Sequence, residues 1–77
     1  MRTTYKMYRF CFYFHKPIPG IAEDGTYKTR CSCRSIRGAE NYARKNAEIF
    51  SRSLFSPTKC VIEYNTTAGK QVREIEF

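Results

Sequence analysis

Four cysteines and one histidine are the residues in this sequence that most directly suggest chemistry. Cys31 and Cys33 have a C-x-C spacing, and Cys11 precedes His15 by four positions. Zinc binds thiolates and imidazoles, but its ligand pairs usually lie on tight turns with C-x₂₋₄-C spacing. The strand alternation described below places the two pairs on opposite faces of a sheet. We therefore expect no metal and free thiols in a reducing compartment, with a zinc-stabilised domain as a third, less favoured hypothesis.

A catalytic nucleophile would need a base within hydrogen-bond distance. His15 is the single histidine, and along an extended strand it would lie about 13 Å from Cys11. The sequence has no carboxylate pair, phosphate-binding glycine loop or cofactor fingerprint. A chain of 77 residues forms one small α+β domain, residues 1–77, with a thin core. We therefore expect a protein that is not an enzyme and has no cofactor.

The charge of the chain is distributed unevenly. Fourteen Lys and Arg residues against seven Asp and Glu residues give a net charge of +7. Residues 1–54 hold eleven basic and four acidic residues, whereas residues 55–77 hold three of each. All of the excess positive charge therefore belongs to the first two-thirds of the chain. Such asymmetry favours nucleic acid, or an acidic protein surface, as the partner.

Residues 4–15 have the composition of a β-strand, because aromatic and β-branched residues dominate and Gly and Pro are absent. Alternate side chains of a strand share a face. One face of this strand is apolar and carries Tyr8, Phe10, Phe12 and Phe14. The opposite face carries Arg9, Tyr13 and His15. We expect the phenylalanines in the core and the polar set facing outward.

Residues 26–34 predict a second strand after a loop rich in Pro and Gly at residues 16–25. Its polar face carries Lys28, Arg30 and Arg34. Antiparallel pairing with the first strand would bring the polar faces of both strands onto one outer face of the sheet. Arg73 would extend this outer face. The predicted face consists of Arg9, Tyr13, His15, Lys28, Arg30 and Arg34.

From Ser35 to about Phe55 the apolar residues recur at helical spacing. The predicted apolar stripe is Ile36, Ala39, Ala43, Ala47, Phe50 and Leu54. Ser35 is the predicted N-cap, and Pro57 prevents continuation. The exposed side carries a second basic surface that includes Arg37 and Arg44.

The last part of the chain predicts a second hairpin. Residues 59–64 and 70–77 have strand patterns, and the turn-rich residues 65–69 separate them. The complete order is β-β-α-β-β. We expect one antiparallel four-stranded sheet with a single helix packed on one face.

The basic and aromatic sheet face is the constellation that best suggests a function. Lysine and arginine neutralise phosphates, and an exposed tyrosine stacks on a base. Open sheets serve as such platforms in RNA-binding modules. The sequence does not rank this face against the helix surface of Arg37 and Arg44, so both stay candidate binding surfaces.

Three segments carry a resemblance to a known group of proteins: "MRTTY" in a short first strand, "CRSIRGAENYARKNAEIF" as an alanine-rich helix, and "TKCVIEYNTTAGKQVREIEF" as a closing hairpin. In element order, length and basic character the chain resembles type I-F anti-CRISPR proteins, which phages make against host defences. The resemblance implies a phage or mobile-element protein that binds nucleic acid or blocks a nucleic-acid-handling host complex. The alternative is an interaction module for an acidic protein surface, without nucleic-acid binding.

The sequence also bears on the location and the assembly of the protein. No apolar run approaches the roughly 20 residues of a membrane span, and residues 1–10 do not have the pattern of a secretory signal. We therefore expect a cytoplasmic protein of the host cell without a membrane partner. The exposed edges of a four-stranded sheet would also permit a homodimer.

Overall fold

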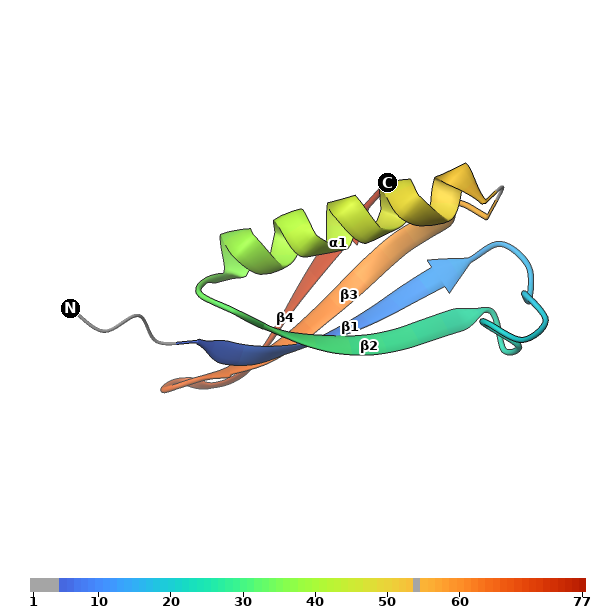
Figure 1. Cartoon of the computed structure of the whole chain (residues 1–77). Helices are drawn as coiled ribbons and strands as arrows, with labels where there is room; N and C mark the ends of the chain where they lie inside the picture. Colours follow the sequence, from blue (N-terminus) through green and yellow to red (C-terminus); the bar gives the residue numbers. More distant parts are fainter. Residues whose placement is uncertain (1–4, 54) are drawn as a thin grey trace.

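The computed structural model describes residues 5–53 and 55–77. Four strands and one helix follow one another along the chain: β1 (Lys6–Phe14), β2 (Thr26–Cys33), α1 (Ile36–Arg52), β3 (Pro57–Thr66) and β4 (Gly69–Glu76). The strands form one antiparallel sheet in the order β2-β1-β3-β4, and α1 lies across one face of it (Figure 1). The predicted α+β order β-β-α-β-β is confirmed.

The core lies between β1, β3 and the helix. In β1, Phe10 lies opposite Thr29 of β2 and Ile62 of β3, and its side chain is 1% exposed. Phe12, two residues later, is fully buried. Ala39 and Ala43 of α1 are fully buried as well, and their small side chains let the helix approach the sheet closely. The apolar face predicted for the first strand is therefore the core face.

Aromatic rings fill the core beneath the C-terminal half of α1. The Phe50 ring lies 5.7 Å from that of Phe12 and makes edge contacts with Phe14 and Tyr27 at centroid distances of 5.3 and 5.4 Å. Such tilted and edge-to-face pairs are favourable beyond their burial. This cluster ties the helix to both β1 and β2.

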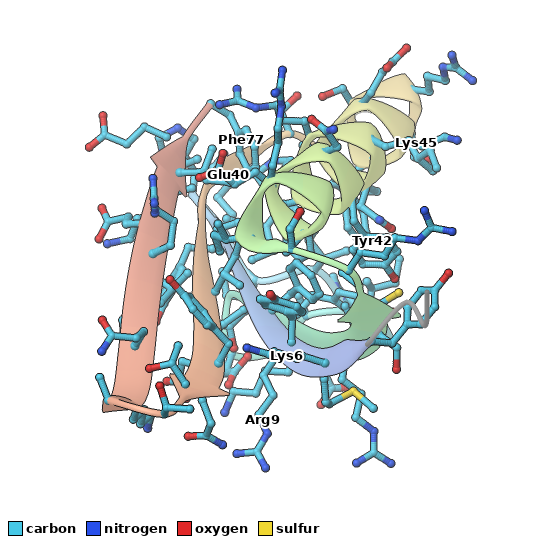
Figure 2. All side chains as sticks on the ribbon, turned by 90° about the vertical axis from the view of Figure 1, so that its left-hand side faces the viewer. Lys6, Arg9, Glu40, Tyr42, Lys45 and Phe77 are labelled. Atoms are coloured by element: carbon cyan, nitrogen blue, oxygen red, sulfur yellow. The ribbon has the colours of Figure 1, made fainter. Side chains whose placement is uncertain are left out.

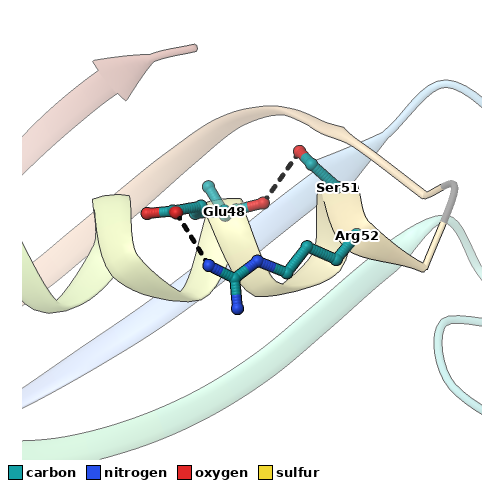
Figure 3. Close-up of polar contacts among 4 residues, drawn as sticks. Glu48, Ser51 and Arg52 are labelled. Atoms are coloured by element: carbon teal, nitrogen blue, oxygen red, sulfur yellow. Dashed lines mark hydrogen bonds and ion pairs between the residues drawn. The ribbon is translucent and has the colours of Figure 1, made fainter.

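The ends of α1 are capped by local hydrogen bonds. The Ser35 hydroxyl accepts a hydrogen bond from the Gly38 N–H at 3.3 Å, which confirms the predicted N-cap. The helix ends at Arg52, earlier than predicted, because the Phe50 carbonyl accepts the N–H of Ser53 at 2.9 Å and so closes a tighter turn. In the last turn the Ser51 hydroxyl donates to the Ala47 carbonyl, as Figure 3 shows. The predicted stripe residue Leu54 lies outside the described residues.

Two connections differ from the expectation. The loop after β1 contributes to the core, because Ile18 and Ala22 are buried and exchange backbone hydrogen bonds of 2.7 and 2.8 Å. The closing hairpin is longer than predicted, and β3 and β4 pair up to Thr66 and Gly69. Gly69 has a φ of +112°, a conformation that side chains disfavour, so glycine lets the strand restart immediately after a two-residue turn.

The burial of Phe12 generates a stability prediction. Phe12→Ala should lower the free energy of unfolding by about 3–5 kcal/mol, because it empties a fully buried aromatic site. The matched control is Ile49→Ala on the exposed side of α1, where the side chain is 54% exposed and the change should stay within about 0.5 kcal/mol. Urea unfolding followed by circular dichroism measures both. Equal midpoints for the Phe12 variant and the parent would contradict the assigned strand faces.

Candidate nucleic-acid interface

The outer face of β1 and β2 carries a strip of positive charge. The register places Arg9 opposite Arg30, and Cys11 opposite Lys28. Arg9, Lys28 and Arg30 are exposed, and Figure 2 shows Arg9 pointing away from the helix side of the sheet. Arg34 follows directly at the end of β2. We refer to these four residues, Arg9, Lys28, Arg30 and Arg34, as the basic strip.

The ion pairs of the molecule leave this strip uncompensated. Within residues 5–53 and 55–77, four ion pairs form, all on α1, β3 and β4: Glu48–Arg52, Lys59–Glu74, Glu63–Lys70 and Glu40–Arg73. None of these pairs uses a cation of β1 or β2. Glu63 and Glu74 of the second hairpin therefore neutralise cations of the same hairpin, and the four cations of the strip carry part of the remaining positive charge, together with those of α1 such as Arg37 and Arg44.

A shallow hollow lies between the strip and β3. It has a volume of about 620 Å³ and is lined by Arg9, Lys28 and Arg30 together with Cys11, Tyr13, Val61 and Glu63. Glu63 lies opposite Arg9 in the sheet, but its Oε2 is 3.2 Å from the Lys70 Nζ. The cations of the hollow thus remain available to an anionic ligand.

Two tyrosines flank the strip, one at each end. Tyr13 is half-buried, and the Lys59 Nζ lies 5.0 Å from its ring centroid, within cation–π distance. A hydrogen bond with the Cys11 side chain raises the pKa of the Tyr13 hydroxyl above its ordinary value of 10.0. Tyr5 is exposed and accepts a 3.1 Å hydrogen bond from the Arg34 Nε. Tyr5 was not among the site residues predicted from the sequence. Its odd number, shared with Arg9, Cys11 and Tyr13, would place it on the same outer face by strand alternation.

Other predicted site residues lie elsewhere. His15 follows β1 beyond a register shift at Phe14, and it borders a separate hollow with Lys16 and Phe55. Arg37 and Arg44 are exposed on α1, which covers the opposite face of the sheet. The structure therefore separates the predicted residues into the strip with Tyr13, the β1 end with His15, and the helix surface.

The expectation that Arg73 continues the outer face was wrong. Arg73 lies opposite Ile62, whose side chain is fully buried beneath the helix. The Arg73 guanidinium consequently reaches α1, where its Nη1 lies 3.1 Å from the Glu40 Oε2. The physical reason is the pleat, since residues paired across a sheet share a face.

The cysteines are free thiols with different environments. Cys33 and Cys60 are buried, whereas Cys11 and Cys31 are half-buried. Burial raises the pKa of the Cys33 thiol, and burial raises that of Cys60 to about 12. In the part of the chain that the structure describes, no group of three or more His, Cys, Asp or Glu residues is arranged to hold a metal ion.

Comparisons with family models, curated proteins and solved structures found no match to this chain. The resemblance to anti-CRISPR proteins therefore stays a prediction. Among the described residues, no helix is long and apolar enough to cross a membrane.

The Cys60 thiol generates a prediction about alkaline pH. Its pKa is about 12 in the folded protein against an ordinary 9.0. Between these two values the unfolded chain loses the proton and the folded protein keeps it, so the stability contributed by the neutral thiol falls as pH rises. Urea unfolding of the parent and Cys60→Ala at pH 8 and pH 10 should give a smaller difference in unfolding free energy at pH 10. A difference that is the same at both pH values would contradict this assignment.

Proposed function

We propose that this protein binds single-stranded nucleic acid through the basic strip on the outer face of β1 and β2. The observation that carries the proposal is a row of cations without ion pairs that has a tyrosine at each end. Four carboxylates of α1, β3 and β4 pair with cations of those same elements, while the arginines and lysine of the strip form no ion pair among the described residues. Phosphates would supply the missing negative charge.

The spacing of the strip suits an extended phosphate backbone. Lys28 and Arg30 are alternate residues of one strand, so their Cα atoms are about 7 Å apart, and the distance to Arg34 extends the row to about 20 Å. The hollow beside them and the tyrosines at the two ends provide room and aromatic surface for unpaired bases. A base-paired duplex would present its phosphates but not its base faces to this shallow surface.

The helix surface supports the proposal less well. Arg37 and Arg44 are exposed on α1 and, like the cations of the strip, form no ion pair among the described residues. The aromatic residues of the helix, Tyr42 and Phe50, are occupied by ring contacts with β1. The helix cations thus lack the aromatic neighbours that the strip has. Blocking a CRISPR complex, which the resemblance implies, would be one biological use of such binding.

Charge reversal on β2 tests the proposal. Binding to a fluorescent single-stranded oligonucleotide is measured by anisotropy at about 50 and 200 mM salt. With about 0.7 counterions released per contacted phosphate, four contacts predict a loss of about 50-fold in affinity between these salt concentrations. The double variant Lys28→Glu, Arg30→Glu should bind at least about tenfold more weakly and reduce the salt slope by about 1.4 or more.

A matched control has the same change in net charge on the helix. Arg44→Glu, Lys45→Glu should bind close to the parent, because both side chains lie on α1, away from the strip. Equal losses in the two double variants would show a nonspecific effect of net charge and contradict the assigned surface. Absence of binding at about 50 mM salt would overturn nucleic acid as the ligand and favour an acidic protein partner.

A further inference from the structure

Among the described residues, β4 is an edge strand of the sheet, and its outward backbone groups have no strand partner. In the described part of the chain its strand partner is β3, over Gly69–Glu76. The Phe77 N–H donates to the Thr58 carbonyl at 3.1 Å, so odd-numbered residues of this segment direct their backbone groups toward β3. Antiparallel pairing alternates, and the N–H and C=O groups of residues 70, 72, 74 and 76 therefore point away from the sheet. At the centre of this edge, the Val72 side chain is 58% exposed.

The side chains along this edge would complement those of a second copy of β4 in charge. If β4 pairs antiparallel with β4 of a second copy around Val72, the two valines lie opposite each other. Lys70 of each copy then lies opposite Glu74 of the other. Within one chain Glu74 already lies 3.7 Å from Lys59, and Lys70 lies 3.2 Å from Glu63. Each side of the interface would therefore continue as a row of alternating charge: Lys59 and Glu74 of one copy, then Lys70 and Glu63 of the other.

Other registers are less favourable. Centring the pair on Arg73 places two arginines directly opposite each other and sets Val72 against Glu74. Centring it on Glu74 places two carboxylates opposite each other. Directly opposed like charges destabilise a sheet. Of these three registers, only the valine-centred one opposes unlike charges without opposing like charges, and it alone sets the two valines against each other.

The other edge of the sheet cannot pair with itself in this way. The outer side chains of β2 include Lys28 and Arg30, and self-pairing around either residue or between them opposes like charges. Charged residues on an edge strand are a common protection against such pairing. The two edges of the sheet therefore differ, since only β4 is electrostatically complementary to a second copy.

We propose that the protein forms a two-fold symmetric dimer through β4, which joins two sheets into one of eight strands. A two-fold axis perpendicular to the sheet keeps both helices on one side. The two basic strips then lie together on the opposite side. Their centres are separated by six strand spacings, or about 30 Å. This proposal does not depend on nucleic-acid binding, and it is tested without a ligand.

Sedimentation equilibrium of the full chain should show a concentration-dependent monomer–dimer equilibrium. Lys70→Glu should raise the dimer dissociation constant by about tenfold, because the new carboxylate at position 70 would lie opposite Glu74 of the other copy. Glu74→Lys should do the same, because it places two ammonium groups opposite each other. Lys45→Glu on the helix has the same charge change as Lys70→Glu and should leave the dissociation constant unchanged.

Mixing the two edge variants provides the decisive outcome. In a mixed dimer of Lys70→Glu with Glu74→Lys, every opposed pair is again oppositely charged, so the mixture should dimerise at concentrations at which each variant alone is monomeric. Failure of the mixture to dimerise would overturn the register. A parent that stays monomeric at millimolar concentration would overturn the dimer. A mass that rises beyond two copies would also overturn it, because it would indicate head-to-tail contacts between β4 and β2.

Discussion

The burial of Phe10 and Phe12 beneath α1 is the constraint on which the rest of the structure depends. Because β1 is a central strand, the inward direction of these two rings sets the faces of both neighbouring strands. A slip of one residue would expose both phenylalanines and bury Arg9, an exchange that a thin core could not tolerate. The outward position of the basic strip is thus a consequence of packing on the opposite side of the same strand.

A single helix covers only one face of the sheet, and this leaves the other face to water. The second hairpin uses its outer face to pair its own charges, through Lys59 with Glu74 and Lys70 with Glu63. The first hairpin has no carboxylate on its two strands, and its strand cations form no ion pair among the described residues. The charge asymmetry of the sequence thereby becomes a spatial asymmetry, with a positive half and a balanced half on one continuous surface.

The alternation of the first two strands could be read from the sequence because each strand has one apolar and one polar face. The same local logic identified the Ser35 cap, whose bond reaches only three residues along the chain. The face of Arg73 could not be read in this way. It depends on the register with Ile62, and that register depends on the two-residue turn of Thr67 and Ala68.

Contacts between residues far apart in the sequence also could not be predicted from local sequence patterns. The hydrogen bond between Arg34 and Tyr5 joins residues 29 positions apart, and the Lys59 contact with Tyr13 crosses from β3 to β1. His15 follows the end of β1, where the β1–β3 register has shifted at Phe14. In each case the position of the side chain is decided by strand pairing rather than by its own neighbours in sequence.

Binding of nucleic acid through the basic strip is tested most directly by an NMR titration of the isotope-labelled protein with a short single-stranded oligonucleotide. We expect the shift changes to concentrate on β1 and β2, at Arg9, Lys28 and Arg30, and to extend to the Tyr5 and Tyr13 rings. Signals of Arg37 and Arg44 on α1 should move little. Changes concentrated on the helix, with β1 and β2 unaffected, would contradict the assignment of the basic strip as the binding surface.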